Sequence, residues 1–286
     1  MGAAAWGALC ALSFGAADFV ARYSSRAVGH ASALLGMLVV GTIGLTLWVA
    51  IERPTIAWSP GHVLLVALNG VTSTAFLLLL YRGLARGPIA VVAPIVATHP
   101  VLIVLFWVAL GARPSVITWI AMAGTLVGSV LVAWAVEPGG QDRAARRDLW
   151  ITIAIASAAT LFYAVAVGSG QAVVPGFGAL PTLWVGRGIG LAALVLLFLW
   201  WRERPRLPRR WLPVLTVQGV LDTAGYLFLL LGSAGAFPEI AAVAGSTFGA
   251  VTTLLAWLVL RERINALQGL GIVLVFVCVG VLTAQG

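Results

Sequence analysis

Lysine is absent from the 286-residue sequence, and charged residues of either sign are few. All 17 basic residues are therefore arginine, only 9 residues are acidic, and charged residues make up 9% of the chain. Hydrophobic residues make up 61%, and the mean hydropathy is +1.06. So few polar residues cannot cover the surface of a water-soluble globule, which excludes an ordinary soluble protein and places the chain in a lipid bilayer.

Cysteine is also scarce, since the chain has only Cys10 and Cys278, both inside apolar stretches. Two isolated thiols provide neither a disulfide framework nor a metal site, so we expect no metal and no cofactor. The arginines lie in short loops between apolar stretches. That pattern is typical of topology control in membrane proteins and argues against binding to nucleic acid.

Ten stretches are long and apolar enough to cross a membrane, which takes about 20 mostly apolar residues. The predicted spans are residues 3–23, 31–51, 62–81, 88–110, 116–136, 149–167, 181–201, 211–231, 239–260 and 266–284. The most polar connection, 137–148, separates the fifth span from the sixth. The fold class that we predict is all-α, a polytopic membrane protein with ten transmembrane helices.

The two halves of the sequence share a layout. Residues 88–132 contain an apolar span rich in small residues, a polar elbow (GARPS, 111–115) and a second apolar span. Residues 238–283 repeat this order around the elbow RERIN, 261–265. A shared layout of this length predicts a duplication. We therefore expect two five-helix repeats, 1–136 and 149–286, joined by a cytoplasmic linker at 137–148.

Two helices around an arginine-containing elbow, present once in each half of a ten-span chain, resemble the EamA-type branch of the drug/metabolite transporter superfamily. Glu262 occupies the place of the elbow glutamate of that family, whereas the first half has Ala112 there. The resemblance implies a carrier of amino acids, their analogues or drug-like amphiphiles. It also implies that the fourth and ninth spans line a central cavity with Pro94, Thr98, His99, Ser246 and Thr247.

Most arginines lie in the loops after odd-numbered spans, while the loops on the opposite side hold only Arg53 and Arg113. The positive-inside rule therefore predicts cytoplasmic odd-numbered loops and both termini outside. Because five spans per half is an odd number, the second half enters the bilayer from the opposite face. Inverted repeats of this kind are favoured by secondary transporters. Heavy use of Ala, Gly, Val, Leu and Arg is typical of a GC-rich bacterial gene, so we expect the bacterial inner membrane.

Ionisable groups inside apolar spans mark candidate sites, because a charge at mid-helix costs about 2.5–3.5 kcal/mol on insertion scales. Asp222 lies near the centre of the eighth span, and Arg187 in the seventh span is its natural partner. Arg187 lies nearer the end of its helix, so the alternative is that its side chain extends outward to the membrane surface. An unpaired Asp222 would take up a proton or find a cation. A structural pair and direct contact with a substrate or coupling proton both stay open. Asp18 is expected to pair with Arg22, four residues further along the same helix.

His99 lies near the middle of the fourth span, between Pro94 and Pro100. Prolines free backbone carbonyls and bend the helix, and such backbone is tolerated where it lines a cavity. A histidine there can change charge near neutral pH and carry a proton. The alternative is a neutral histidine that is bonded to a neighbouring helix.

Further polar residues complete the candidate set. Asn69 and Gln218 occupy matching places in the third and eighth spans, each followed by Gly-Val. Such a pair can face a shared axis, or each amide can bind a backbone carbonyl. Tyr163 and Tyr226 can stack on an organic substrate or serve in packing.

Together these patterns predict a secondary active transporter that moves a small organic metabolite across the inner membrane by alternating access. Its partners are the substrate, the lipid bilayer and, as a candidate coupling ion, the proton. A monomer and a homodimer are both compatible with the sequence. One alternative is a flippase for a lipid-linked substrate. A less expected one is an intramembrane enzyme, because the sequence has no GxSxG motif and no acidic pair beside His99.

The arginine asymmetry generates a first prediction. A reporter fused after Gly286 should signal from the periplasm, since both termini are expected outside. A second reporter inserted in the loop 137–148 serves as the control and should signal from the cytoplasm. A cytoplasmic signal from the fusion at Gly286 would contradict the orientation.

Overall fold

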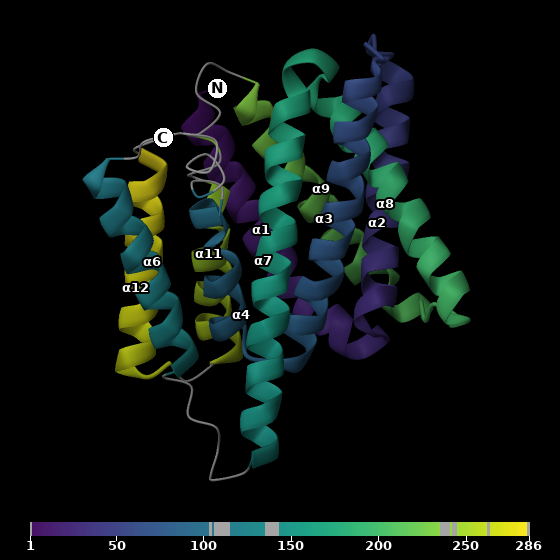
Figure 1. Cartoon of the computed structure of the whole chain (residues 1–286). Coiled ribbons are helices and arrows are strands. Elements are labelled where there is room, and N and C mark those ends of the chain that lie inside the picture. Colours follow the sequence, from purple (N-terminus) through teal and green to yellow (C-terminus); the bar gives the residue numbers. More distant parts are fainter. Residues whose placement is uncertain are drawn as a thin grey trace.

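The computed structural model describes residues 2–102, 105, 115–134, 143–234, 241, 245–261 and 264–284. Within these residues the chain forms ten α-helices and no strand (Figure 1). The helices are α1 (Ala3–Val28), α2 (His30–Glu52), α3 (Pro60–Arg86), α4 (Ile89–Val96), α6 (Val116–Trp134), α7 (Arg143–Phe177), α8 (Ala179–Trp201), α9 (Leu212–Ser233), α11 (Phe248–Leu255) and α12 (Ala266–Ala284). A 3-10 turn, Arg209–Trp211, precedes α9, and a π-helical turn, Ala256–Leu260, follows α11. The predicted all-helical fold with ten helices is confirmed.

Within the described part of the chain, five helical segments are long and apolar enough to cross a membrane by length and composition alone. They are His30–Glu52, Pro60–Arg86, Arg146–Phe177, Ala179–Trp201 and Arg209–Ser233. Each corresponds to one of the predicted spans. The distribution of side chains agrees with a lipid environment, because Leu196 and Val220 are exposed whereas Asn69, Gln218 and Asp222 are buried. Apolar groups thus face outward, where lipid tails would meet them, and polar groups face inward.

Helix α7 extends beyond its predicted span at both ends. Helix α7 begins at Arg143, inside the predicted linker, because the sequence RAARR consists of good helix formers. It continues to Phe177, ten residues beyond the predicted end at Val167, where Val173, Val174 and Phe177 are buried. Its 35 residues span about 50 Å, well above the hydrocarbon thickness of a bilayer. In Figure 1 its lower end accordingly extends beyond the neighbouring helices.

The fourth span is interrupted where its prolines lie. Helix α4 ends at Val96, a turn follows at Ala97 and Thr98, and helical backbone resumes at residues 99–102. Pro100 has no N–H to donate to the carbonyl of Val96, four residues earlier, so the regular hydrogen-bond ladder cannot continue there. The predicted distortion of this span is present. The remainder of the predicted span lies largely outside the described residues.

Matching turns flank the second helix of each half. Helix α2 follows Gly29, and helix α8 follows Gly178, with φ angles of 89° and 88°. The two helices end in left-handed arginines, Arg53 at φ 47° and Arg202 at φ 56°. Gly29 and Gly178 are separated by the same number of residues as Arg53 and Arg202. Left-handed backbone is uncommon outside glycine, so its recurrence in register supports a duplication.

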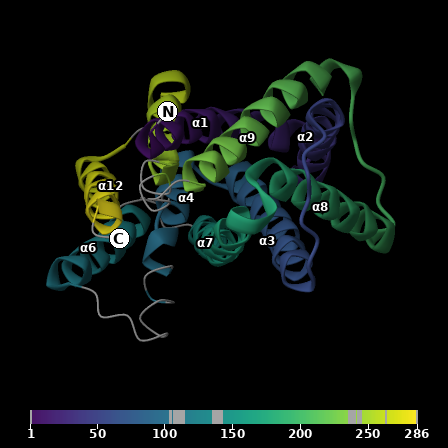
Figure 2. The same ribbon diagram turned by 90° about the horizontal axis from the view of Figure 1, so that it is seen from above.

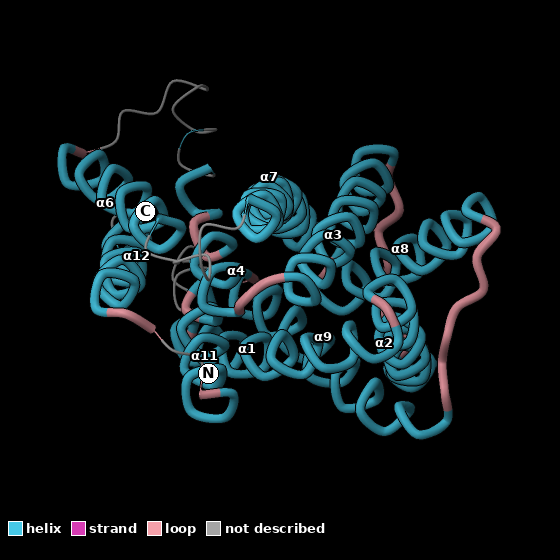
Figure 3. Tube along the Cα trace, turned by 90° about the horizontal axis from the view of Figure 1, so that it is seen from below, coloured by secondary structure: helices cyan, strands magenta, loops and turns pink. Residues whose placement is uncertain are grey.

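Helix packing follows the same correspondence. The counterparts in the two halves are α1 and α7, α2 and α8, α3 and α9, and α4 and α11. Helices α1 and α2 both pack on α9, and their counterparts α7 and α8 both pack on α3. In the same way α1 packs on α11, and α7 packs on α4. Helices α2 and α8, α4 and α11, and α6 and α12 each pack against their own counterpart. Seen from above and from below, the pair α6 and α12 lies side by side at one edge of the bundle (Figures 2 and 3). The contacts are those expected of two halves related by an approximate two-fold axis, and they are consistent with inverted repeats.

Glycines permit the closest of these contacts. A Cβ atom at Gly219 in α9 would lie 2.9 Å from the carbonyl oxygen of Met37 and 2.8 Å from Cβ of Val40, both in α2. At the matching contact of the other half, a Cβ atom at Gly70 in α3 would lie 2.6 Å from the carbonyl oxygen of Gly186 in α8. Because lipid supplies no hydrophobic drive between helices, such backbone contact is a main source of packing energy.

The contact at Gly219 generates a prediction. Gly219→Ala should lower the free energy of unfolding of the purified protein in detergent by about 1–3 kcal/mol, because the new methyl group meets the backbone of α2. The matched control is Gly44→Ala in α2, where an added Cβ meets nothing within 4 Å. There alanine should leave stability unchanged or raise it, since it is the better helix former. Equal effects at the two positions would contradict the proposed packing.

Candidate functional site

A buried ion pair joins helices α8 and α9. Nη2 of Arg187 donates to Oδ2 of Asp222, and the two side chains are only 5% and 2% exposed. Nη1 of the same guanidinium lies 3.8 Å from the sulfur of Met37 in α2. Arg187 therefore points into the bundle and does not extend outward to the membrane surface. Pairing offsets part of the cost that either charge would carry alone in a membrane interior.

The pair does not use all donors of the guanidinium. Arginine has five N–H donors, and Nε of Arg187 is buried without a hydrogen-bond acceptor among the described residues. A buried, unsatisfied donor of a charged group is costly. The site thus retains capacity to bind an acceptor group.

A small cavity lies beside this pair, between helices of both halves. The residues that line it are Leu38 of α2, Asn69, Gly70, Ser73 and Thr74 of α3, Leu183, Gly186 and Arg187 of α8, and Tyr226 of α9. It has room for about one water molecule. This cavity is therefore too small for a metabolite in this conformation, and a metabolite could enter it only if α2, α3, α8 and α9 moved apart.

Asn69 and Tyr226 hold one wall of the cavity in place. Nδ2 of Asn69 donates to the carbonyl oxygen of Ala166 at 2.7 Å and also to the hydroxyl of Tyr226. That hydroxyl donates in turn to the carbonyl oxygen of Ala166 at 3.3 Å. The Arg187 Cζ atom lies 5.8 Å from the centroid of the Tyr226 ring, within range of a cation–π interaction. These contacts tie α3, α7, α8 and α9 to one polar centre.

Gln218 matches Asn69 in sequence but has a different partner. Its Oε1 accepts a hydrogen bond of 2.6 Å from the Ser24 hydroxyl of α1. Gln218 is fully buried and is not among the residues that line the cavity. Of the two amides, Asn69 is therefore the one at the candidate site.

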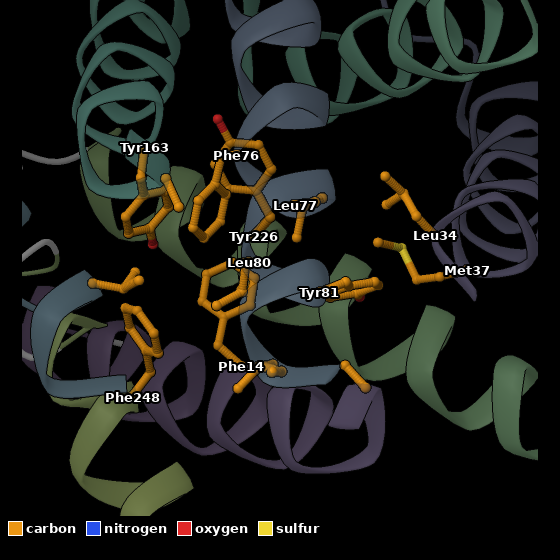
Figure 4. Packing of buried hydrophobic residues seen from close by; sticks show 14 of the residues in the cluster. Phe14, Leu34, Met37, Phe76, Leu77, Leu80, Tyr81, Tyr163, Tyr226 and Phe248 are labelled. Atoms are coloured by element: carbon orange, nitrogen blue, oxygen red, sulfur yellow. The ribbon is translucent and has the colours of Figure 1, made fainter. Parts of the chain in front are cut away.

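His99 lies in an aromatic cluster near the cavity. Its Nδ1 lies 3.3 Å from the carbonyl oxygen of Val96, and Nδ1 is the donor because a carbonyl oxygen only accepts. This is the carbonyl group to which Pro100, four residues later, cannot donate a backbone hydrogen bond. The ring packs edge-on against Tyr163, with centroids 4.4 Å apart, and lies 6.5 Å from the Phe248 ring. Tyr163 stacks on Phe76 at 4.3 Å (Figure 4). In this conformation both His99 and Tyr163 thus have packing roles.

The aromatic cluster reaches the cavity through Tyr226. The Phe14 ring lies 6.3 Å from the Tyr226 ring and 6.0 Å from the Phe248 ring, so α1, α9 and α11 meet there. Figure 4 shows Phe14, Phe76, Tyr163, Tyr226 and Phe248 grouped together, whereas Tyr81 lies toward Leu34 and Met37. The cluster separates the polar centre from α4 and α11.

The other candidates occupy separate places. The Thr98 hydroxyl donates to the carbonyl oxygen of Ile95 at 2.7 Å, Pro94 is buried within α4, and Ser246 and Thr247 immediately precede α11. Glu262 lies outside the described residues.

On α1, Asp18 and Arg22 are both buried, and Nη1 of Arg22 donates to the carbonyl oxygen of Gly87 at 2.8 Å. The pairing of Asp18 with Arg22 stays a prediction. Among the described residues there is no group of three His, Cys, Asp or Glu side chains that could hold a metal ion.

Sequence reasoning missed Ser73 and Thr74, which line the cavity one turn after Asn69. Hydroxyl residues are common in membrane helices, so neither stood out. Aligning the two halves would have indicated them. The alignment that places Asn69 on Gln218 also places Ser73 on Asp222 and Thr74 on Thr223.

Comparisons with known proteins agree with this architecture. The model of the EamA-like transporter family matches residues 1–134 and 150–284, which together form most of the chain. No curated protein sequence matches significantly. Among solved structures, one crystal structure with 18% sequence identity superposes with a TM-score of 0.68, over 99% of this chain and 96% of that one. At this identity the structural similarity concerns the fold alone.

Proposed function

Because the chain belongs to the EamA-like transporter family, we propose that it is a secondary active transporter that moves a small organic metabolite by alternating access. It is a multi-pass membrane protein, so its partners include the lipid bilayer and a transported substrate. The family consists of transporters and not of enzymes, which removes the intramembrane enzyme from consideration. The polar centre at Arg187, Asp222 and Asn69 is the proposed substrate site.

One observation carries this proposal: the polar centre lies where corresponding helices of the two halves meet. Arg187 and Asp222 come from the second half, while Asn69, Ser73 and Thr74 come from the first. When two halves are related by an axis in the membrane plane, exchanging their packing geometries opens the same central site to the opposite side. A site at the interface of the halves is therefore accessible from each side in turn.

Glycine contacts supply surfaces on which the halves can move. Gly70 and Gly186 meet between α3 and α8, and Gly219 meets backbone of α2. Smooth backbone contacts of this kind lack interlocking side chains, so small sliding motions displace few groups. The closed cavity of the structure then represents one conformation of a cycle, and substrate entry requires these four helices to separate.

The energy source that we propose is the gradient of the substrate or of an exchanged second substrate. Coupling to protons through His99 or Asp222 is the alternative. We further propose the bacterial inner membrane as the location, with both termini outside, and residues 1–136 and 149–286 as the repeats on either side of the linker. This orientation places the exposed pair Arg86–Asp148, at 2.6 Å, on the cytoplasmic side.

Counterflow in liposomes tests the proposed function. Purified protein is reconstituted into vesicles loaded with pooled water-soluble metabolites, and uptake of the same metabolites in labelled form is measured by mass spectrometry. We expect exchange of one or a few metabolites at rates well above those of protein-free vesicles, because a carrier exchanges substrate without an external energy source.

Two outcomes would contradict the proposal. Movement confined to lipid-linked substrates, measured in the same vesicles with a fluorescent polyprenyl-linked probe, would instead indicate a flippase. Absence of exchange in every pool, with protein that remains folded in the vesicles, would also overturn a metabolite carrier.

A further inference from the structure

The loop between α8 and α9, residues 202–210, holds five of the 17 arginines of the chain. Its only acidic residue is Glu203, so the loop has a strong net positive charge. The five arginines are all exposed, and they are Arg202, Arg204, Arg206, Arg209 and Arg210. An exposed group of like charges attracts a ligand of the opposite sign.

The guanidinium groups of these five arginines have no hydrogen bond or ion pair among the described residues. Other arginines on the same side of the bundle do have acceptors. Nε of Arg26 donates to the carbonyl oxygen of Ala85 at 3.2 Å, and Nη2 of Arg86 donates to Asp148 at 2.6 Å. The planar donors of the 202–210 loop are therefore free to bind phosphate or carboxylate oxygens in pairs.

Contacts with α2 hold this loop in place. The backbone N–H of Arg206 donates to the hydroxyl of Ser32 at 3.0 Å. The side chain of Leu207 is half-buried against the core and lies beside Gly36. Arg204 and Leu207 also favour extended backbone, because a proline follows each of them. The arginines are thus presented by an anchored, extended segment.

The extended backbone decides which way the side chains point, because successive side chains lie on opposite faces of such a segment. Leu207 faces α2, and Glu203 interacts electrostatically with His30 at the start of α2. The residues between them in the alternation, Arg204 and Arg206, therefore point away from the bundle. They face whatever surrounds the protein at this level.

The surroundings of the loop are the boundary between lipid and water. Helices α8 and α9 are both long and apolar enough to cross a membrane. Trp200 and Trp201 are exposed at the end of α8, and Trp211 is half-buried just before α9. Indole rings favour the level of the lipid headgroups. The loop also runs along the outer edge of the bundle, remote from α6 and α12 (Figures 2 and 3).

From these observations we propose that the 202–210 loop is a binding site for anionic phospholipid headgroups, in the leaflet that surrounds the ends of α8 and α9. The outward guanidinium groups bind the lipid phosphate through paired N–H donors. The acyl chains follow the exposed apolar side chains Leu196 and Leu199 of α8. Lipid binding at this loop does not depend on the proposed transport function.

The charge of the loop distinguishes between classes of lipid. A zwitterionic headgroup carries a cation of its own, which the arginines repel. An anionic headgroup has no such cation, and each arginine near a surface of these lipids strengthens binding. The site should therefore prefer phosphatidylglycerol to phosphatidylcholine.

This preference is measured with the purified full chain in a neutral detergent. The protein is titrated with phosphatidylglycerol or with phosphatidylcholine of the same acyl chains. Native mass spectrometry counts the lipids that the protein retains, and thermal unfolding reports their stabilisation. We expect phosphatidylglycerol to be retained and to stabilise at concentrations where phosphatidylcholine does neither. High salt should reduce the difference, because it screens exposed charges.

Removal of three guanidinium groups tests the loop itself. In the triple variant Arg204→Gln, Arg206→Gln, Arg209→Gln, affinity for phosphatidylglycerol should fall by about a hundredfold. The expected loss is about fivefold for each arginine that lies near an anionic surface. Affinity for phosphatidylcholine should not change.

The matched control removes three exposed arginines elsewhere, at the end of α2 and near the start of α7. The triple variant Arg53→Gln, Arg146→Gln, Arg147→Gln makes the same change in net charge. It should leave affinity for phosphatidylglycerol within about fivefold of wild type, since exposed charges at a distance are screened. Thermal unfolding without lipid should be the same for both triple variants, because the changes lie on the surface.

Three outcomes would overturn the proposal. They are equal retention of the two lipids by the wild type, equal losses in the two triple variants, and stabilisation by inorganic phosphate or a short oligonucleotide as strong as by phosphatidylglycerol. The last would indicate an anion site without a role for the membrane. Absence of counterflow, by contrast, would refute the carrier and leave lipid binding at the loop intact.

Discussion

The ion pair between Arg187 and Asp222 is the constraint on which the rest of the structure depends. Neither charge is tolerable alone in the interior of a membrane bundle, so α8 and α9 must bring the two side chains together. The groups around them are arranged accordingly, with Asn69 fixing Tyr226, and Tyr226 lying beside the guanidinium. The pair is adequate for folding, but the unused Nε donor makes it incomplete as a hydrogen-bonding unit. That unused donor is the reason why we propose a substrate site here and not a purely structural bridge.

Duplication accounts for the position of such a centre between two halves. The two halves have the same backbone conformation at the turns, at Gly29 and Gly178, and the same close helix contacts, at Gly70 and Gly219. Side chains at the axis diverged, since Leu38 and Ser73 stand where the other half has Arg187 and Asp222. In the proposed transport cycle the symmetric backbone would allow two equivalent openings, and the asymmetric side chains would form a single substrate site. Both properties suit a carrier that presents one substrate to either side of a membrane.

Hydropathy predicted the ten helices because an apolar run of membrane length is compatible with few structures besides a spanning helix, and the prolines of the fourth span correctly indicated its interruption. The extent of α7 was missed, since the polar stretch Gly168 to Gln171 resembles the end of a span although tertiary packing carries the helix through it. The sequence offered a pair between Arg187 and Asp222 as one of two alternatives, because each charge in the membrane interior needs a partner, and the structure contains that pair. The packing of His99 was not resolved, because periodicity does not reveal that its ring meets Tyr163. Neutral lining residues such as Ser73 carry no signal without the register of the repeat.

A double-mutant cycle on Arg187 and Asp222 tests the central claim most directly. The free energy of unfolding is measured in detergent micelles for Arg187→Gln, Asp222→Asn and the double variant, with the exposed pair Arg86 and Asp148 as reference. Each core variant should cost about 3–5 kcal/mol, and the double variant should cost much less than their sum, because it leaves no unpaired charge. The reference pair should show a coupling of at most about 1 kcal/mol. Additive costs at Arg187 and Asp222 would contradict a buried ion pair at the centre of the bundle.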